Sequence, residues 1–581
     1  MQPIVITGEG IVCAIGNDEN SVAEHLMARR TGIGPVRHLS SVHHELPVGE
    51  VKLSNAEMKR QLGIESSVQM SRTALMGIMA VGQALHKAHV QSDGRRRIVL
   101  ISGTTVAGMD ITEQAFAAMV AHGADKACLD HHDCGSNTAD IARYFSLFDD
   151  CTTISTACSS AANALELGAD MLKVDDADIV VAGGTEALSK FHLNGFNALM
   201  ILDHDVCRPF DKSRAGLNLG EGAAYVVLER EDDALRRGVH IDACLSGYGN
   251  ACDAFHQTAT SPDGLGAQLA MRHALAMAGL TPDAIQWIHA HGTGTPNNDE
   301  SESRAIRGVF GETLPPVSST KGFTGHTTSA SGSIAAVIAV IAMQHRFIPV
   351  NLGFQQPMDD GVVPYMQTAP HDLHAVMVNS FGFGGNDSSL ILTDTPTGAQ
   401  QPKVLDEADI IEVARVENDS LEAIRNIRQY VSPMESRRMG KLMKSTLLTS
   451  LEALKQADVS CPDAIVTGTA WGCLENSEQL LLQLIEGEDL LKPTLFMQST
   501  HNTLSSAIAI HLKCHGSNLT FTQRARSLHW ALYQAKLLLR LGRCRTVLVG
   551  CHDERTPLFN RLLGQEGKAV DSTAIVLTIK K

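Results

Sequence analysis

What this sequence lacks excludes several classes of protein. No apolar run reaches the length of a membrane span, and no basic region precedes the apolar N-terminal stretch, so neither a membrane protein nor a signal peptide is indicated. The 13 cysteines follow no regular framework, which favours reduced thiols in a cytoplasmic protein over disulfides. A net charge of −16 argues against a nucleic-acid partner, because phosphate binding needs a basic surface.

The chain has enough apolar residues for more than one hydrophobic core. Of its 581 residues, 44% are hydrophobic and 19% are charged, which is typical of globular chains and predicts two to four domains. Short apolar runs at 98–102 and 178–184 indicate buried strands, and apolar residues at helical spacing over 69–89 predict a helix. Buried strands alternating with helices predict an α/β fold with a parallel sheet covered on both faces.

One cysteine stands where an apolar strand is expected to turn into a helix. In TTISTACSSAANALELGADML, Ile154 ends the strand and the helix begins near Ser159, so Cys158 lies at the elbow. The unpaired N–H groups and partial positive charge at a helix start favour a thiolate, and the small neighbours leave the sulfur accessible. Cys158 is therefore a candidate nucleophile, although a lone cysteine is more often a small buried hydrophobe.

Three further glycine-rich loops follow buried strands. They hold His291 in AHGTGTPNND, His326 in STKGFTGH, and Phe383 in NSFGFGGN. Because reactive groups gather beyond the carboxyl ends of strands in parallel sheets, we expect these loops to converge on Cys158. A fourth stretch, RPFDKSRAGLNLGEGAA from residue 208, predicts backbone packed tightly beside the same centre.

The cluster CLDHHDC at residues 128–134 contains residue types that can bind zinc. Ligands so close in sequence need a folded-back loop, and no second CxxC or HxxxH pair completes a tetrahedral set. A polar loop is therefore the prediction here.

Together these motifs resemble the β-ketoacyl-acyl-carrier-protein synthases of the elongating, Cys-His-His type. TACSSA around Cys158, AHGTGTPNND around His291, STKGFTGH up to His326 and NSFGFGGN around Phe383 occur in family order, within residues 1 to about 398. A thiolase would need a second cysteine in a CxG turn where this sequence has GFGG. A chain-initiating synthase would pair its cysteine with a histidine and an asparagine, so the resemblance is to the elongating class.

The resemblance implies a thiolase-like five-layer αβαβα sandwich of two similar halves, 1–235 and 236–398. It also implies an acyltransferase that condenses an acyl-enzyme thioester with a malonyl thioester, with loss of carbon dioxide, in fatty acid or polyketide biosynthesis. An acyl carrier protein would be the partner and would carry the substrates on its phosphopantetheine. No free cofactor and no metal are therefore expected.

The same resemblance implies a role for each site residue. Cys158 would take the acyl group, while His291 and His326 would stabilise the enolate that decarboxylation produces. The backbone N–H groups of Cys158 and Phe383 would form an oxyanion hole, and Phe383 matches a gating phenylalanine. Lys321 stands where the family has a lysine, and completes the candidate catalytic set.

Two departures from the family pattern bear on the site. The glutamate usually found on the helix after the second histidine is Ala335 here, so either another carboxylate supplies charge near Lys321 or Lys321 is more exposed than usual. The basic run expected to contact the carrier protein is thin, which leaves Lys59, Arg60 and Arg72 as candidates. A solvated charged face is the alternative interpretation of these three residues.

The acyl chain itself is not named by the sequence. Val106 stands near the acyl tunnel in relatives, and the apolar segment 196–201 suggests room for a medium or long chain. Side-chain size alone sets no length.

Residues 399–581 begin the pattern again. GTAWG at 468–472 echoes GTTVA at 103–107, and TVLVG at 546–550 echoes IVVAG at 179–183. Aligned from the later strand without gaps, Ala525 falls where Cys158 would be, which predicts a degenerate repeat of the N-terminal half, similar to a chain-length factor. We expect this segment to pack on the synthase body or on a partner chain, shaping the acyl tunnel or the dimer. A passenger that only adds bulk is the alternative.

A second function class remains open from the sequence. A non-condensing subunit, similar to a chain-length factor, would bind acyl carrier proteins without turnover. Cys158 with both histidines argues against this interpretation for 1–398, and the interpretation suits 399–581 better. A homodimer, or a heterodimer with a ketosynthase-like subunit, is expected. The fusion is similar to proteins of aryl polyene or flexirubin-type pigment pathways.

Overall fold

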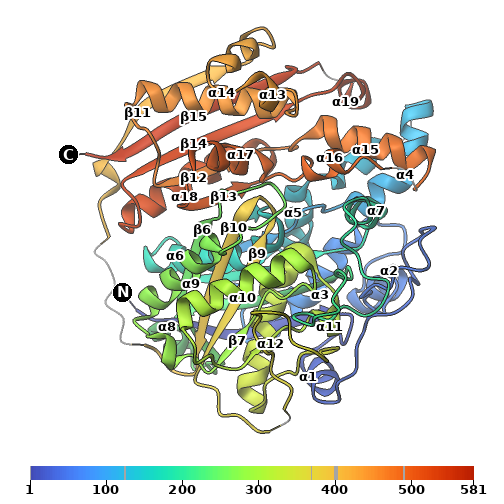
Figure 1. The fold of residues 1–581 in the computed structure, drawn as a ribbon, viewed down its shortest axis with the longest axis vertical. Helices are drawn as coiled ribbons and strands as arrows, with labels where there is room; N and C mark the ends of the chain where they lie inside the picture. The colour runs from blue at the N-terminus through green and yellow to red at the C-terminus, as the bar shows by residue number, and fades with distance from the viewer. Residues whose placement is uncertain are drawn as a thin grey trace.

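The computed structural model describes residues 2–123, 126–367, 369–397, 404–488, 491–564 and 566–580. Within these ranges fifteen strands form one continuous sheet that runs through the molecule (Figure 1). In sheet order the strands are β11 (Ile410–Asn418), β15 (Val570–Ile579), β14 (Thr546–Glu554), β12 (Ala464–Gly468), β13 (Ser517–Phe521), β3 (Asp150–Ile154), β2 (Ile98–Gly103), β4 (Ile179–Glu186), β5 (Gly222–Arg230), β1 (Ile4–Cys13), β6 (Ala243–Cys252), β10 (Asn386–Thr393), β9 (Ala375–Gly382), β7 (Trp287–His289) and β8 (Val317–Ser318).

The sheet is built from three five-stranded units that share one strand order. In the first unit β2 is parallel to β3 and β4, and β5 is antiparallel to β4 and β1. The same pairings recur in a second unit of β6 to β10 and in a third unit of β11 to β15. The predicted α/β fold is confirmed, and the third unit repeats the topology of the first. The sheet is mixed rather than parallel as predicted, because two strands of each unit run antiparallel to their neighbours.

Helices cover the faces of the sheet. The first unit carries α1 (Glu19–Met27), α2 (Asn55–Leu62), α3 (Arg72–Lys87), α4 (Met109–His122), α5 (Cys134–Phe145), α6 (Ser160–Lys173), α7 (Lys190–Ala198) and α8 (Glu231–Arg237). The second carries α9 (Leu265–Ala278), α10 (Pro296–Phe310), α11 (Lys321–Thr324) and α12 (Ser331–His345). The third carries α13 (Pro433–Ser436), α14 (Lys441–Gln456), α15 (Leu474–Glu486), α16 (Pro493–Met497), α17 (Thr503–Leu512), α18 (Ser527–Arg540) and α19 (Pro557–Leu563).

Two largely buried helices, one from each of the first two units, form the central layer of the fold. Helices α6 and α12 are buried along nearly their whole length and pack against each other between the strands of the two units. The apolar stretch Thr328–His345 is long enough to cross a membrane, unlike our expectation for the sequence, yet 89% of it is buried inside the protein. It is therefore a core helix, whose small Ala, Gly and Ser residues allow close packing.

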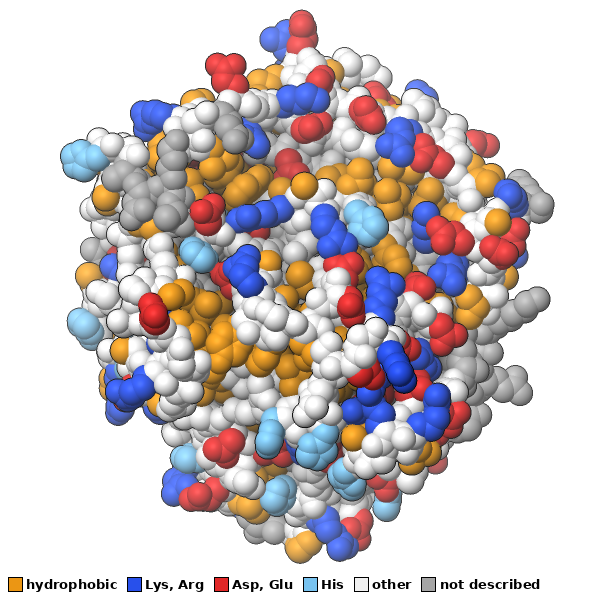
Figure 2. Space-filling model, turned by 180° about the vertical axis from the view of Figure 1, so that it is seen from behind, with side chains coloured by type: hydrophobic (Ala, Val, Ile, Leu, Met, Phe, Trp, Pro, Cys, Tyr) orange, Lys and Arg blue, Asp and Glu red, His pale blue; other side chains and the backbone are white. Residues whose placement is uncertain are grey.

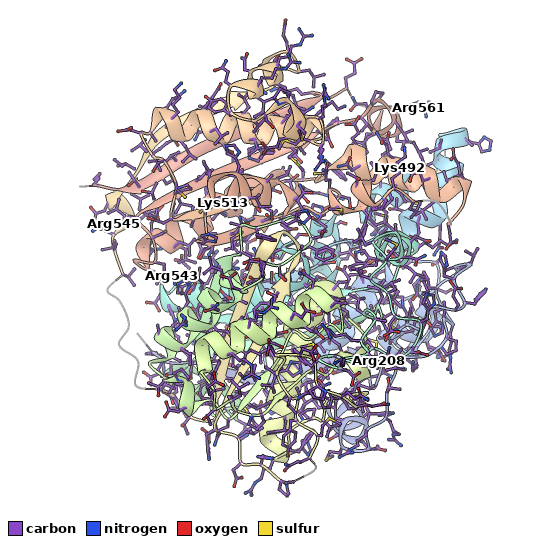
Figure 3. The ribbon with its side chains drawn as sticks, in the orientation of Figure 1. Arg208, Lys492, Lys513, Arg543, Arg545 and Arg561 are labelled. Atoms are coloured by element: carbon purple, nitrogen blue, oxygen red, sulfur yellow. The ribbon has the colours of Figure 1, made fainter. Side chains whose placement is uncertain are left out.

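The third unit is joined to the first at the edge of β3. Strand β13 runs antiparallel to β3, with Phe521 opposite Ile154, and the N–H groups of Ser155 and Thr522 donate across the junction at 2.9 and 3.0 Å. Arg543 forms a buried ion pair with Asp170 of α6 and is labelled at this junction in Figure 3. An edge that would otherwise expose unpaired backbone groups is thus covered by the same chain.

The two elbows after β3 and β13 have the same local structure. Ala157 and Arg524 both adopt a positive φ, at 53° and 48°, although neither is glycine. Ser160 Oγ accepts from Thr156 N and donates to Ala157 O, and Ser527 Oγ makes the equivalent bonds in the third unit. Ala525 lies in the middle of its turn as Cys158 does in the other, so the gapless alignment is confirmed.

Candidate active site

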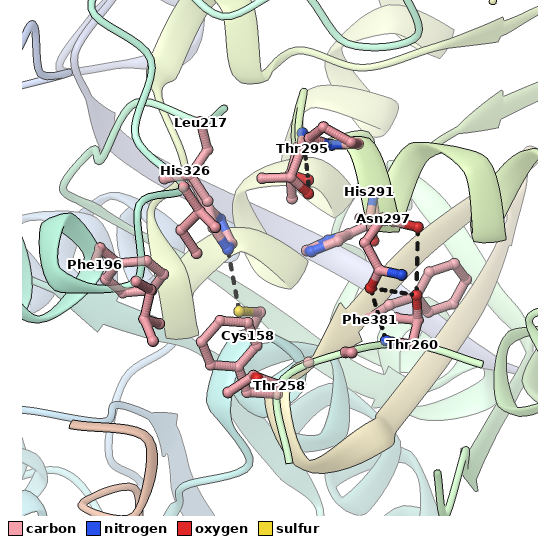
Figure 4. Close-up of a pocket in the computed structure, with 18 of the residues that line it drawn as sticks. Cys158, Phe196, Leu217, Thr258, Thr260, His291, Thr295, Asn297, His326 and Phe381 are labelled. Carbon is pink, nitrogen blue, oxygen red and sulfur yellow. Dashed lines mark hydrogen bonds between the residues drawn. The ribbon is translucent and has the colours of Figure 1, made fainter. Parts of the chain in front are cut away.

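The predicted loops meet at one cavity. It has a volume of about 430 Å³ and is lined by Cys158, His291, His326, Phe381 and Phe383 among others (Figure 4). Sγ of Cys158 and ring nitrogens of the two histidines lie within 4.8 Å of one another. In the described part of the chain no other group of three His, Cys, Asp or Glu side chains brings its ligand atoms so close. The convergence predicted from the strand ends is confirmed.

Cys158 lies at the elbow between β3 and α6, with 6% of its surface exposed. Burial raises the pKa of its thiol from 9.0 to about 11, and the Lys321 cation and two backbone N–H groups offset only part of this shift. The expectation of a resting thiolate is therefore wrong. A thiolate there loses more from desolvation than it gains from the helix N-terminus, so the resting group is a neutral thiol that needs a base.

His326 is placed to be that base. Its Nε2 lies 3.1 Å from Cys158 Sγ, and its Nδ1 lies 3.0 Å from the hydroxyl of Ser331 (Figure 4). When Nδ1 donates to Ser331, the lone pair of Nε2 faces the sulfur. Burial, with the nearby Lys321 cation, lowers the pKa of His326 well below 6.5, so the ring is neutral and able to accept a proton.

His291 faces the same sulfur from the loop after β7. Its ring centroid lies 5.2 Å from that of His326, with the rings at 83°. Lys321 Nζ lies 3.4 Å from His291 Nδ1 and also donates to the His291 carbonyl. Because a cation beside Nδ1 favours the tautomer with its proton on Nε2, His291 presents an N–H donor to the cavity. Burial and the Lys321 cation lower the pKa of His291 well below 6.5.

Lys321 is buried, with 6% of its surface exposed, so solvent does not compensate its charge. Burial lowers its pKa to about 8, and the Glu302 carboxylate is the largest influence in the opposite direction. Glu302 accepts from the N–H groups of His291 and Gly292 at 2.8 and 2.7 Å. Glu302 thus supplies the negative charge near Lys321 that the family's glutamate would supply at the position of Ala335. This is the first of the two alternatives that the sequence left open. The motif search missed Glu302, although it stands in the acidic run NNDESE.

Phe383 begins the turn after β9. Its backbone N–H faces Cys158 and lowers the pKa of the thiol, as does the N–H of Cys158 itself. Two backbone N–H donors therefore lie beside the sulfur. The Phe383 ring stacks on Phe196, with centroids 5.8 Å apart, and Phe496 of the third unit makes a T-shaped contact with Phe196 at 5.1 Å. Sequence patterns gave no sign of Phe496.

The glycine-rich stretch after residue 208 lies against the catalytic loop. Gly220 N donates to the His326 carbonyl at 2.9 Å, and a Cβ on Gly220 would collide with the carbonyl of Thr324. The close packing predicted for this stretch is confirmed.

Several predicted residues lie elsewhere. Val106 lines a separate cavity of about 50 Å³ with Trp471 and Phe496, so it does not line the cavity of Cys158. Arg72 is buried and paired with Glu221 at 2.6 Å, which excludes it as a surface contact for a carrier protein. Loss of its guanidinium would leave the Glu221 carboxylate buried without its ion partner.

Side chains of the cluster at residues 128–134 form hydrogen bonds and an ion pair within the fold. His131 bonds to Asp140 at 2.9 Å, and Asp133 caps α5 and pairs with Arg524 of the third unit at 2.6 Å. Its ligand atoms do not gather in one place among the described residues. The segment forms a short helical turn and the start of α5 rather than the polar loop that we predicted.

Comparison with known proteins identifies the family. Residues 1–234 match the model described as beta-ketoacyl synthase, N-terminal domain, residues 242–355 match the corresponding C-terminal domain, and residues 414–580 match a second N-terminal domain. The chain is 32% identical to 3-oxoacyl-[acyl-carrier-protein] synthase 2 of Vibrio cholerae over 407 residues, which cover 67% of this chain and 98% of that protein. The chain belongs to the β-ketoacyl synthase family, and the predicted resemblance is confirmed.

Two solved structures extend the comparison. The ishigamide ketosynthase/chain length factor is 32% identical, with a TM-score of 0.64, over 68% of this chain and 99% of its own. The PfaC keto synthase-chain length factor is 17% identical, with a TM-score of 0.81, over 100% of this chain and 78% of its own. The second likeness concerns the fold alone. Together with the family models they confirm a thiolase-like body and the internal repeat.

Proposed function

We propose that this chain is a β-ketoacyl-acyl-carrier-protein synthase that condenses an acyl-enzyme thioester with a malonyl thioester, with loss of carbon dioxide. One observation carries the proposal: a buried thiol and two neutral imidazoles lie within 4.8 Å of one another in a 430 Å³ cavity. The similarity to 3-oxoacyl-[acyl-carrier-protein] synthase 2 of Vibrio cholerae supports the reaction class.

The first half-reaction acylates Cys158. His326 Nε2 takes the thiol proton as Sγ attacks the acyl thioester, and the N–H groups of Cys158 and Phe383 stabilise the tetrahedral oxyanion. The bond from the carbonyl carbon to the carrier sulfur then breaks, and the proton held by His326 leaves with that sulfur. The neutral state of His326 before the reaction suits it to this transfer.

The second half-reaction makes the carbon nucleophile. Loss of carbon dioxide from the malonyl group leaves the electron pair on an enolate, whose oxygen accepts a hydrogen bond from His291 Nε2. It accepts a second from His326 Nε2 once the ring adopts its other tautomer, in which Ser331 Oγ donates to Nδ1. The enolate carbon attacks the acyl carbonyl, the bond to Cys158 Sγ breaks, and one proton taken up from solvent restores the thiol. Lys321 acts through His291, because its ammonium fixes the ring tautomer that presents a donor.

An acyl carrier protein is the proposed partner, and its phosphopantetheine would deliver both substrates without a free cofactor. Met200 lines the cavity of Cys158 and is 89% exposed, so an opening of the cavity to solvent lies there. The view in Figure 2 shows Lys and Arg side chains interspersed with acidic ones, so the net negative charge does not exclude local contact with an acidic partner.

We further propose three functional segments, namely 1–235, 236–398 and 399–581, with the last serving as a chain-length-factor-like unit. The pairing of β13 with β3 supports this, because the third unit covers the edge of the nucleophile strand. A homodimer or a heterodimer remains a prediction, and a second subunit would need a surface other than this edge. A non-condensing role remains the better description of the third unit, where Ala525 replaces the nucleophile.

The pathway and location are proposed more broadly. Fatty acid or polyketide biosynthesis fits the reaction, with aryl polyene synthesis as one candidate. The 13 free cysteines are consistent with the cytoplasmic location that we predict.

Intact mass spectrometry tests the proposed function. The protein is incubated with a panel of acyl-carrier-protein thioesters, and one acyl mass per chain is expected on the wild type and none on Cys158→Ala. The acyl group loaded fastest names the substrate. Loading that survives in Cys158→Ala would contradict the assignment of the nucleophile. Loading without condensation after addition of malonyl carrier protein would favour the non-condensing alternative.

A further inference from the structure

The third unit reaches the active site through the start of α17. His501 Nδ1 lies 3.1 Å from Oγ of Ser155, in the turn that leads to Cys158. The next residue, Asn502, donates from Nδ2 to the carbonyl oxygen of Phe383 at 2.8 Å. Two consecutive residues of the third unit therefore contact both turns that supply N–H groups to the oxyanion hole.

The bond from Asn502 acts on a backbone group next to the reacting centre. The accepting carbonyl belongs to the peptide bond between Phe383 and Gly384, one residue after the N–H that faces Cys158. Asn502 is 1% exposed, so no water competes freely for this bond. On the other side of the turn, Gly384 N donates to the Gln257 carbonyl at 2.7 Å. The turn is thus held from both sides.

Glycine is required in this turn because the third unit packs against it. Gly384 has φ of 82°, which other residues rarely adopt. A Cβ at that position would also collide with Ser506 Oγ of α17 and with the Asn502 amide. The sequence of the gating turn and the surface of α17 are therefore matched to each other.

We propose that Asn502 is a positioning residue for the condensation reaction. By holding the Phe383 carbonyl it keeps the Phe383 N–H directed at the oxygen of the acyl-enzyme, so the third unit contributes to the catalytic rate as well as to packing. This inference rests on the proposed function, since the N–H group matters to catalysis only when Cys158 carries an acyl group.

Two substitutions remove the bond. Asn502→Ala removes the whole amide, and Asn502→Leu removes it while keeping a similar volume. Gln498→Ala is the matched control, because buried Gln498 makes the same kind of bond, from Nε2 to the Arg438 carbonyl at 2.8 Å, without touching the turn. Each full-length protein is assayed for kcat and KM with acyl and malonyl carrier proteins. Hydrogen exchange is followed in the peptide that covers residues 381–386.

We expect both Asn502 variants to lower kcat about tenfold, as the loss of one buried hydrogen bond would, with KM for the carrier proteins within about twofold of the wild type. Amide exchange in 381–386 should rise by a similar factor, while β13 and α18 exchange as before. Gln498→Ala should leave kcat and that peptide unchanged.

Asn502 variants that match Gln498→Ala in kcat and in exchange would overturn the positioning role. A wild-type protein that loads but does not condense would instead overturn the proposed function, so the two failures are distinguishable. If the alanine variant does not fold, the volume-preserving leucine variant carries the same test with the same criteria.

Discussion

The elbows at Cys158 and at Ala525 share a backbone but not a chemistry. Both follow a parallel strand, place a non-glycine residue at positive φ and are held by one serine hydroxyl. At the first, two imidazoles face a thiol. At the second, the flanking Arg524 and Arg526 reach outward and pair with Asp133 and Asp150 of the first unit, each at 2.6 Å.

This difference shows that the elbow is a property of the scaffold. A positive φ at a residue with a side chain costs about 1 kcal/mol or more, and the third unit retains it without a nucleophile to position. The turn there serves association of the units instead. The two elbows therefore differ in what the second unit places opposite the first, namely His291 and His326.

The largest loss of condensation activity is expected when the cysteine is moved from the first elbow to the second. The double variant C158A/A525C keeps one cysteine at an elbow, but the cavity beside Ala525 is lined by groups such as Arg524, Arg555 and Asp553. Condensation should fall by about 10⁴-fold or more, because no matched base and oxyanion hole serve the new thiol. Steady-state release of carbon dioxide measures this, with A525C alone as the control at wild-type activity. Recovered activity in the double variant would mean that the elbow alone suffices.

The next largest effect distinguishes the roles of His326 and His291 in the two half-reactions. His326→Ala should slow both acyl loading and condensation by about 10²–10⁴-fold, since the thiol loses its base. His291→Ala should slow condensation by about 10²-fold or more while loading changes little, because His291 donates only to the enolate. Single-turnover assays of each half-reaction give both values. Equal losses of loading in the two variants would contradict the division of roles.

A smaller effect compares two ion pairs that join the units. Arg543→Ala leaves Asp170, which is 1% exposed, without its partner and should lower the free energy of unfolding by about 3 kcal/mol. The Arg526 side chain is 48% exposed, so Arg526→Ala should cost less than about 1 kcal/mol. Urea unfolding measures both. Equal losses would show that burial does not set the strength of the junction.

The smallest effect concerns pH. With its pKa raised to about 11, the Cys158 thiol ionises only above neutral pH, so its alkylation by iodoacetamide should accelerate about tenfold per pH unit from 8 to 10. Lys321→Met removes a cation that lowers this pKa, and should slow alkylation several-fold at pH 8, where part of Lys321 is still charged, and have little effect at pH 10. Peptide mapping of the labelled Cys158 gives the rates. Faster alkylation in the variant would reverse the sign of the Lys321 effect.

The order of the motifs was enough to predict the fold, the site and the repeat. Cys158, His291, His326 and Phe383 each follow the end of a strand, which marked them as one group. Their strands belong to two units joined by antiparallel pairs, and it is the packing of these units that brings the loops together. The charge state of the thiol was mispredicted, since a helix start can be recognised in a sequence whereas the depth of burial cannot.

Contacts between residues that are far apart in the sequence could not be predicted either. Glu302 replaces the missing glutamate from another helix. Arg72 points inward because it pairs with the buried carboxylate of Glu221, a contact that no local sequence pattern reveals. Asn502 meets Phe383 only after the third unit docks, so no motif within either segment predicts their contact.

The most direct test of the central claim follows one acyl group on the sulfur. The enzyme is loaded from an acyl carrier protein, digested to confirm that the acyl mass lies on the Cys158 peptide, and chased with malonyl carrier protein. We predict that the acyl mass leaves Cys158 as one carbon dioxide is released and one β-ketoacyl product, two carbons longer, is formed. An acyl group that stays on Cys158 through the chase, or a product that forms without it, would contradict the account.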